Sequence, residues 1–353
     1  MPSATSNGIN SAAIIGVMQA AFYAGDRTIT QGDCTPVDPG PEQVQIRVSH
    51  CGVCGTDLHI WHGSMDKRVD MPAILGHEMS GEISAVGAGV QAWDEGDRVT
   101  VMPLDFGAKA PSGHSHIADF MKFMGIDSPG AFQSYWTVDA STLFRLPGEL
   151  SLEHGALIEP LAVACHDVRL GEVQPGENVV VIGGGPIGML VAMVAKHAGG
   201  NVIVSEVNPF RVAKAKELGL EAVNPVEVDL DALIQDRTDG IGADVVFEVS
   251  GSGAGAGLMT DLLRIRGRIV VVAVFAHKPE VDLFRFFWRE LKLCGARVYE
   301  AQDYEEAIRI AASGKLPLAN LITEVTGLDG LGGAFEKMDA GGECMKILID
   351  VGR

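Results

Sequence analysis

A glycine-rich turn near the middle of the chain constrains the fold more than any other feature. Residues 179–182 are a fully apolar run with β propensity, and the letters GGGPIG follow at once at residues 183–188. Residues 189–197 then have helical composition. A strand, a G-x-G-x-x-G turn and a helix in this order predict a βαβ unit whose turn binds the pyrophosphate of a dinucleotide.

Each glycine of this turn has its own physical role. Gly183 permits the tight turn, Gly185 lets backbone N–H groups approach the pyrophosphate, and Gly188 allows the helix to pack closely on the strand. Pro186 and Ile187 complete the predicted cofactor-binding turn. The competing interpretation, a glycine turn in an ordinary α/β sheet, is weaker because strand, glycines and a downstream acid occur together.

That acid is Glu206, at the end of the next predicted strand. A carboxylate there can accept hydrogen bonds from the adenosine ribose hydroxyls and would repel a 2′-phosphate, which favours NAD over NADP. Arg211 follows five residues later and tempers that preference.

Chain length and strand pattern predict two domains. At 353 residues the chain is too long for one hydrophobic core. Short β runs up to about Val138 predict an antiparallel, partly closed β domain, whereas strands alternate with helical stretches after Pro160. The pattern becomes mixed again after Gly295. The predicted parts are a flexible N-terminal extension (1–17), a catalytic β domain (18–160 and 296–353) and a dinucleotide-binding domain (161–295).

Composition argues against several classes of function. The net charge of −19 repels phosphate backbones, which disfavours nucleic-acid binding and, more weakly, anionic membrane surfaces. No apolar run reaches the ~18 residues needed to cross a bilayer. Six scattered cysteines are not a disulfide framework, and the first residues lack a secretory pattern. These features favour a cytoplasmic protein.

A second group of residues contains the side-chain types that bind a metal ion in a site with one open coordination position. The C-x-x-C pair at residues 51–54 could be a redox pair, half of a structural zinc site, or one ligand with a bystander. No second such pair occurs, and His77 and Glu78 add an imidazole and a carboxylate. Three protein ligands and an open position are what catalytic zinc requires, and a Cys/His/Glu set supplies them.

The motifs also occur in a specific order: CGVCGTDLH at 51–59, GHE at 76–78, GDRV at 96–99, EP at 159–160 and the turn at 183–188. Together they resemble the zinc-dependent medium-chain dehydrogenase/reductase family, and the EP pair resembles its polyol dehydrogenase branch. The resemblance covers nearly all the chain after Met18. It implies an α/β fold, with a GroES-like partly closed β-barrel catalytic domain and a Rossmann doubly wound parallel sheet.

By that resemblance, Cys54, His77 and Glu159 bind one catalytic Zn²⁺. Glu78 would be a near neighbour that approaches the metal or holds a bound water, and Asp57 would orient His77.

Two further residues extend the implied site. The Thr56 hydroxyl would take the proton of the substrate alcohol, and His59 would pass it towards solvent through the nicotinamide ribose. In isolation His59 would be interpreted as an ordinary polar side chain; the motif favours the relay.

The sequence departs from the family pattern at residues 103–120. Many members carry four closely spaced cysteines in this lobe for a structural zinc, but this segment has none, so the structural zinc is predicted to be absent. His114 and His116 invite a metal interpretation, because residues i and i+2 on a strand share a face. With no third ligand nearby, a polar loop is the better interpretation.

These observations predict a zinc- and NAD-dependent enzyme that reversibly oxidises a secondary hydroxyl of a polyol or sugar-like alcohol to a ketone. Alternative small-molecule substrates are a vicinal diol, threonine, and a sugar acid or keto-deoxy sugar acid. An acid would need a cation in the cleft, for which Lys67, Arg68 and Arg297 are the candidates. The alternative of another class is a non-catalytic nucleotide-binding protein, which the intact ligand set disfavours.

The resemblance finally implies a homo-oligomer, either a homotetramer or a dimer. Its expected contacts are the edge strand of the nucleotide domain near residues 270–274 and the segment after Asp282.

Overall fold

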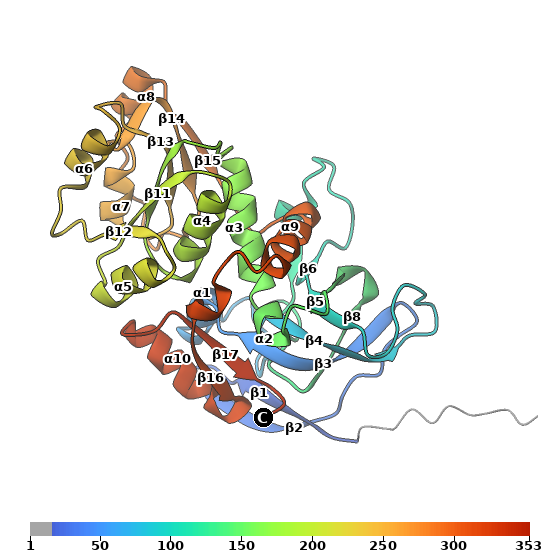
Figure 1. Cartoon of the computed structure of the whole chain (residues 1–353). Helices are drawn as coiled ribbons and strands as arrows, with labels where there is room; N and C mark the ends of the chain where they lie inside the picture. Colours follow the sequence, from blue (N-terminus) through green and yellow to red (C-terminus); the bar gives the residue numbers. More distant parts are fainter. Residues whose placement is uncertain (1–15) are drawn as a thin grey trace, which may run out of the picture.

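The computed structural model describes residues 16–353, which form a parallel α/β part and a mainly antiparallel β part (Figure 1). The predicted flexible extension, residues 1–17, lies almost wholly outside the described residues. The first strand, β1, begins at Met18.

The α/β part is built on a six-stranded parallel sheet in the order β12-β11-β10-β13-β14-β15. This order is that of a Rossmann sheet, in which the first strand of the unit lies centrally and the order reverses beside it. The central strand is apolar and buried from Val179 to Ile182, because neighbouring strands and helices cover both of its faces. The strands are β10 (Asn178–Ile182), β11 (Asn201–Ser205), β12 (Glu221–Val223), β13 (Ala243–Glu248), β14 (Leu263–Val271) and β15 (Lys292–Gly295).

Helices connect these strands. They are α4 (Pro186–His197), α5 (Pro209–Glu217), α6 (Leu230–Arg237), α7 (Gly253–Leu258) and α8 (Leu283–Arg289).

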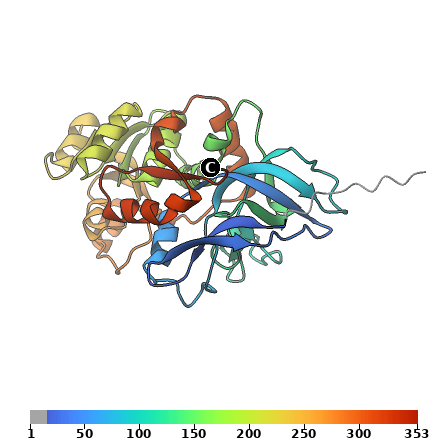
Figure 2. The same ribbon diagram turned by 90° about the horizontal axis from the view of Figure 1, so that it is seen from below.

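The β part contains a seven-stranded sheet in the order β16-β17-β3-β4-β5-β9, with β8 paired to β3. The last strand of the chain pairs antiparallel with β3, so the two chain ends build one sheet (Figure 2). Two small sheets, β1-β2 and β6-β7, complete this part. The strands are β1 (Met18–Tyr23), β2 (Ile29–Cys34), β3 (Gln43–Gly52), β4 (Glu78–Val86), β5 (Arg98–Val101), β6 (Leu104–Asp105), β7 (Lys122–Phe123), β8 (Tyr135–Asp139), β9 (Leu143–Arg145), β16 (Ile322–Gly327) and β17 (Lys346–Asp350).

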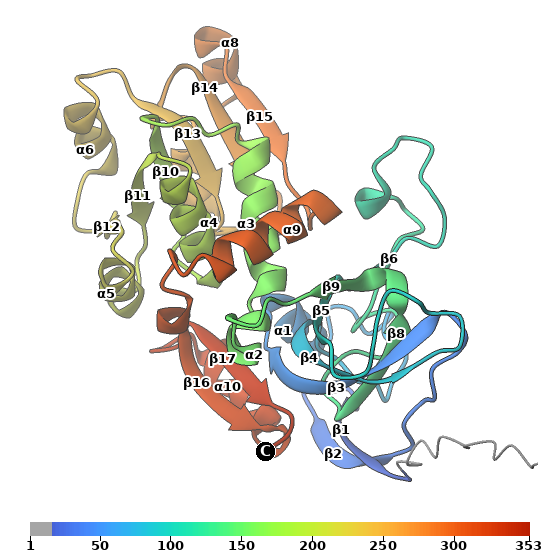
Figure 3. The ribbon, with the colours of Figure 1, turned by 45° about the vertical axis from the view of Figure 1, so that its right-hand side comes forward.

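Helix α3 joins the two parts, and α9 packs across it (Figure 3). Buried residues lie all along α3, because it contacts β4 and β5 at one end and α4 further along. The remaining helices are α1 (Gly55–Trp61), α2 (Leu152–Gly155), α3 (Ile158–Leu170), α9 (Ala301–Ala312) and α10 (Leu331–Ala340), with 3₁₀ turns η1 (Ser115–Ile117), η2 (Ala140–Thr142), η3 (Leu318–Leu321) and η4 (Leu328–Gly330).

The predicted fold class, a partly closed β domain with a doubly wound parallel sheet, is confirmed. The predicted domain boundaries stay a prediction, and the one at residue 160 falls inside α3. The expectation that residues 270–274 form the sheet edge is wrong, since β14 is covered by β15, which is the edge strand. Within residues 16–353, no helix combines the length and apolarity of a membrane span.

Candidate active site

Cys54 occupies the N-cap of α1, immediately after β3 ends at Gly52. Its backbone N–H donates to Oδ2 of Asp57 over 2.9 Å, which closes a capping box at the first turn. This cap fixes the backbone at Cys54 and holds the Asp57 carboxylate at the first turn of α1.

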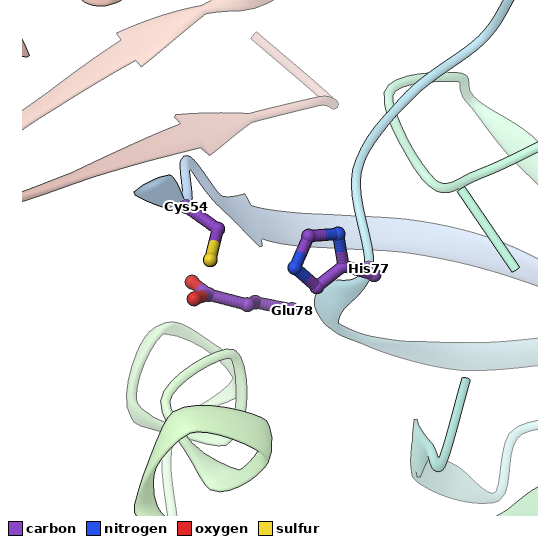
Figure 4. Close-up of side chains that lie close together, drawn as sticks. All are labelled: Cys54, His77 and Glu78. Atoms are coloured by element: carbon purple, nitrogen blue, oxygen red, sulfur yellow. The ribbon is translucent and has the colours of Figure 1, made fainter. Parts of the chain in front are cut away.

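His77 and Glu78 come from the start of β4, which pairs with β3 so that Glu78 lies opposite Gly52. An added Cβ at residue 52 would lie 2.1 Å from Oε2 of Glu78, so a side chain there would displace this carboxylate. The ligating atoms of Cys54, His77 and Glu78 all lie within 4.8 Å of one another. Figure 4 shows the thiol, the carboxylate and the imidazole converging.

Several buried polar atoms at this point lack partners among the described residues. His77 Nδ1 lies 3.6 Å from Oδ1 of Asp57, too far for a hydrogen bond, and neither atom has another partner. Oε1 of Glu78 is also without a hydrogen bond. The unpaired Oε1 of Glu78, buried beside a thiol and an imidazole, fits a metal ion, which would provide its missing partner.

The site is strongly electronegative. Burial opposes charging of His77, but Asp57, Cys54 and Glu159 outweigh it and raise the pKa of His77 to about 10. A potential that holds a proton on a buried imidazole also attracts a dication, which would replace that proton.

Glu78 and Lys346 form a buried ion pair, and the Lys346 Nζ also donates to the carbonyl oxygen of Val53 over 3.0 Å. Burial disfavours the charged ammonium, but Glu78 and Cys54 overcome this and raise the pKa of Lys346. The lysine therefore offsets part of the negative charge at the site.

Glu159 lies in the first turn of α3 and is 5% exposed. Its Oε1 accepts a 2.7 Å hydrogen bond from the hydroxyl of Tyr299. Burial raises the pKa of Glu159 to about 7 against the opposing effect of His77. The compact group of possible ligands contains Glu78 rather than Glu159, so ligation by Glu159 stays a prediction.

The two predicted relay residues lie on α1. Thr56 is half-buried in its first turn, whereas His59 is exposed in its last turn. The proton relay through these two residues stays a prediction.

The glycine-rich turn connects β10 to α4. Gly183 has φ +102°, a left-handed conformation that favours glycine, and a Cβ on Gly188 would lie 1.9 Å from the Gly183 carbonyl oxygen. Gly185 is the N-cap of α4, Pro186 is its first residue, and Ile187 follows half-buried. A Cβ on Gly185 would meet only the end of Arg211, at 3.8 Å, so a ligand can approach the backbone there.

Glu206 follows β11 and is 6% exposed. Its carboxylate accepts hydrogen bonds from the backbone N–H groups of Gly184 and Asn208, each 2.7 Å long. Arg211 Nη1 lies 4.0 Å from Oε2 of Glu206. The acid is therefore held rigidly beside the turn, with the arginine next to it.

Two residues of the site were not assigned a role from the sequence. Lys346 begins β17 and is followed by three apolar residues. A lysine buried in a sheet needs a carboxylate partner, and this was a signal that the sequence offered. Tyr299 follows no periodic pattern, and its contact with Glu159 depends on the packing of residues far apart in the chain.

Of the candidate cations, Arg68 is already paired, with Nε and Nη2 donating to the two oxygens of Asp127 over 2.6 and 2.5 Å. Lys67 and Arg297 are exposed.

The prediction that His114 and His116 lack a third ligand is wrong. They lie around a 3₁₀ turn rather than on a strand, and the carboxylate of Glu300 lies within 4.8 Å of both rings. The sequence could not show this contact, because Glu300 lies almost 200 residues after the two histidines and belongs to the C-terminal part of the chain.

Comparisons with known proteins agree with this geometry. Residues 40–148 match the alcohol dehydrogenase GroES-like domain, and residues 186–313 match the zinc-binding dehydrogenase family. A 2-dehydro-3-deoxy-L-galactonate 5-dehydrogenase of Pseudoalteromonas atlantica is 48% identical over 336 residues, which are 94% of this chain and 98% of that protein. A sorbitol dehydrogenase of Halalkalibacterium halodurans is 35% identical over 88% of this chain and 92% of its own.

Among solved structures, 2R,3R-butanediol dehydrogenase from Bacillus subtilis matches with a TM-score of 0.88 and 33% identity. The match covers 94% of this chain and 99% of that one. The chain therefore belongs to the zinc-dependent medium-chain dehydrogenase/reductase family, with likeness to its polyol dehydrogenases. It is an enzyme that oxidises the CH–OH group of an alcohol in a zinc-dependent reaction.

Proposed function

We propose that this enzyme uses NAD to oxidise a secondary hydroxyl of a keto-deoxy sugar acid to a ketone. The observation that carries the substrate class is the 48% identity, over almost the whole of both chains, to a dehydrogenase of 2-dehydro-3-deoxy-L-galactonate. The sequence alone favoured a neutral polyol as the substrate and gave a sugar acid as an alternative. The similarity to this relative leads us to propose the sugar acid first.

Cys54 and His77, with Glu159 or Glu78 as the carboxylate, would hold one catalytic zinc per chain. Bound zinc supplies Lewis-acid chemistry, which lowers the pKa of a hydroxyl placed against it. Asp57, whose Oδ1 lies 3.6 Å from Nδ1 of His77, would orient that ring, and Lys346 offsets the negative charge of Glu78.

Zinc analysis of the Cys54→Ser variant tests this ligand set. The variant should lose the catalytic zinc and at least ~10³-fold in kcat/KM, because a hydroxyl is a far poorer zinc ligand than a thiolate. Cys51→Ala is the matched control and should keep its zinc and its kcat/KM. Cys51 is buried, and within residues 16–353 its sulfur donates only to the Gly52 carbonyl oxygen. Equal losses in both variants would refute the proposed ligands.

Thr56 would accept the hydroxyl proton of the substrate, and His59 would deliver it to solvent. Removing His59 should lower kcat about 10²-fold, because the exit path then lacks an imidazole that can accept and release the proton. Added imidazole should restore part of the rate. A His59→Ala enzyme with an unchanged pH profile would exclude the relay.

The turn at residues 183–188 would hold the dinucleotide pyrophosphate at the N-terminus of α4. Glu206 would accept the adenosine ribose hydroxyls, which favours NAD. Glu206→Ala should shift the ratio of kcat/KM values towards NADP by at least tenfold, since Arg211 would then face a 2′-phosphate without the acid beside it. An unchanged ratio would contradict the assignment.

Substrate class is tested by NAD reduction with keto-deoxy sugar acids, neutral polyols, vicinal diols and threonine. The proposal expects the highest kcat/KM with a keto-deoxy sugar acid. Sorbitol or xylitol oxidised at equal or higher efficiency would favour the second candidate, a neutral polyol, which the sorbitol dehydrogenase relative supports.

An acid substrate requires a cation in the cleft. Because Arg68 is occupied by Asp127, Lys67 and Arg297 are the remaining candidates from the sequence. Replacing either by alanine should raise KM for the acid about tenfold or more without changing KM for a neutral alcohol. An unchanged KM for the acid in both variants would exclude these two positions.

We also infer a cytoplasmic homo-oligomer, a dimer or tetramer. The supporting feature is an apolar patch on α8, formed by Leu283, Phe284, Phe287 and Trp288, which are between 65% and 77% exposed. Helix α8 directly precedes β15, which is the edge strand of the parallel sheet. An exposed group of four large apolar side chains next to an open sheet edge is typical of a subunit contact.

A further inference from the structure

A second group of metal-ligating side chains lies outside the candidate active site. His114 is the N-cap of η1, His116 lies within η1, and Glu300 is the N-cap of α9. One ligating atom from each lies within 4.8 Å of the others. These residues come from opposite ends of the chain, so their meeting is a property of the tertiary structure.

Glu300 is held in place with one oxygen to spare. Arg169 Nη2 donates to its Oε2 over 2.5 Å, and Gln302 Nε2 donates to the same oxygen over 3.2 Å. Its backbone N–H donates to Oδ2 of Asp303 over 2.9 Å. Both side-chain hydrogen bonds found within residues 16–353 use Oε2, which leaves Oε1 available as a ligand.

His116 is 7% exposed, and its ring forms no hydrogen bond with residues 16–353. Its ring lies 5.4 Å from that of His166, edge to face, and 6.0 Å from that of His114. His166 is fixed by a 2.8 Å contact between Nδ1 and Oδ2 of Asp303. The ring nitrogens of His116 are therefore not engaged by the described part of the chain and are available to a ligand.

The charges around the group accommodate a dication. Glu300 and Asp303 bring two negative charges and Arg169 brings one positive charge. With neutral imidazoles the cluster carries one net negative charge. Two imidazole nitrogens and one carboxylate oxygen are a donor set that suits Zn²⁺ and related transition metals.

We propose that His114, His116 and Glu300 form a second metal site that binds a divalent transition metal such as Zn²⁺. The site lies in the lobe where the sequence lacks the cysteines of a structural zinc, and it uses different ligands. With this site, the chain would bind two metal ions instead of the single zinc predicted from the sequence.

A metal here would fasten the segment between β6 and β7 to α9 and, through the contact of His116 with His166, to α3. Figure 3 shows this segment extending beside α9. Helix α3 also carries Glu159, so the site would hold the lobe against the helix that joins the two parts of the molecule.

Cobalt titration of the metal-depleted full-length chain separates the two sites. A site with the Cys54 thiolate shows a near-ultraviolet charge-transfer band, whereas a site of imidazoles and carboxylate shows only visible d–d bands. Wild type should bind two Co²⁺ per chain, His114→Ala and His116→Ala should each bind one and keep the near-ultraviolet band, and Cys54→Ser should bind one without it.

His277→Ala removes an exposed histidine elsewhere and should still bind two Co²⁺. His114 is itself exposed, so its variant is expected to fold even if replacement of the buried His116 does not. One Co²⁺ per wild-type chain together with the near-ultraviolet band, or two Co²⁺ in His114→Ala, would overturn the proposal. Loss of the thiolate band is a separate readout and bears only on the catalytic site.

Discussion

Tyr299 holds a carboxylate at the candidate zinc site through a single hydrogen bond. Its hydroxyl donates to Oε1 of Glu159 over 2.7 Å, and both side chains are buried. A carboxylate in such surroundings keeps its orientation only while its partner is present, and partners of this kind tune metal affinity.

Tyr299→Phe should therefore weaken zinc binding about tenfold or more and lower kcat/KM by a similar factor. The measurement is competition with a chelator, followed by steady-state kinetics. Tyr304→Phe is the matched control, because its hydroxyl donates to the Val101 carbonyl oxygen rather than to Glu159. The control should cost about 1 kcal/mol of stability and leave zinc affinity unchanged. Equal weakening in the two variants would show a general packing effect.

At the scale of elements, the β10–α4 turn depends on close contact between two glycines. In Gly188→Ala the new Cβ would lie 1.9 Å from the carbonyl oxygen of Gly183, so the first turn of α4 must move away from the strand. The expected results are a free energy of unfolding lower by about 1–3 kcal/mol and NAD binding at least tenfold weaker.

Gly257→Ala is the control, because it lies in α7 and an added Cβ meets nothing within 4 Å. It should raise stability by about 0.5–1 kcal/mol and leave NAD affinity unchanged. Chemical denaturation and calorimetric titration with NAD measure both effects. Normal NAD affinity in Gly188→Ala would contradict the role given to this turn.

Helix α3 contains a buried carboxylate whose charge opposes folding. Neither oxygen of Asp167 has a hydrogen-bond partner within residues 16–353, and burial together with the nearby Asp303 raises its pKa well above the usual 3.8. A folded-state pKa above the unfolded one means that the folded chain binds the proton more tightly. Its contribution to stability is therefore greatest at acid pH and falls as pH rises from about 4 towards the folded pKa.

Asp167→Asn removes the ionisation and should raise the free energy of unfolding by ~1–2 kcal/mol at pH 8, with a smaller gain at pH 5. Urea unfolding at the two pH values provides the comparison. Asp236→Asn, on the exposed surface of α6, should behave like the wild type at both. A gain for Asp167→Asn that does not depend on pH would contradict the raised pKa.

At the scale of the whole molecule, helix α8, which carries the apolar patch, lies at the end of the α/β part far from the β part (Figure 1). Phe284 stacks on Trp288 with ring centroids 5.8 Å apart, so the patch is preformed. Because a monomer would expose these rings to water, the patch is expected to be covered by a second copy of the chain.

Trp288→Glu should shift the protein to a smaller assembly, since a carboxylate buried in a subunit contact is costly. Light scattering coupled to size-exclusion chromatography measures the mass. Val226→Glu is the control, because Val226 is 81% exposed and lies away from α8, before α6. A monomeric wild type, or an unchanged mass for Trp288→Glu, would exclude this contact.

The sequence by itself determined the features that depend on neighbouring residues. The apolar run of β10, the glycines after it and the helix of α4 follow one another in the chain, and local propensity and sterics decide their structure. The same holds for Cys54, whose place at a helix start follows from the short motif around it. The residue types of a zinc site and the partly closed β domain with a Rossmann sheet were accessible in this way.

Only the tertiary structure decided which distant residues meet. Lys346 reaches Glu78 because β17 pairs with β3, and Glu300 reaches His114 and His116 because α9 packs on α3. Sheet order likewise decided that β15, not β14, forms the edge. Such contacts depend on how whole elements pack to bury their apolar faces, a balance of energies summed over the molecule that no single stretch of sequence contains.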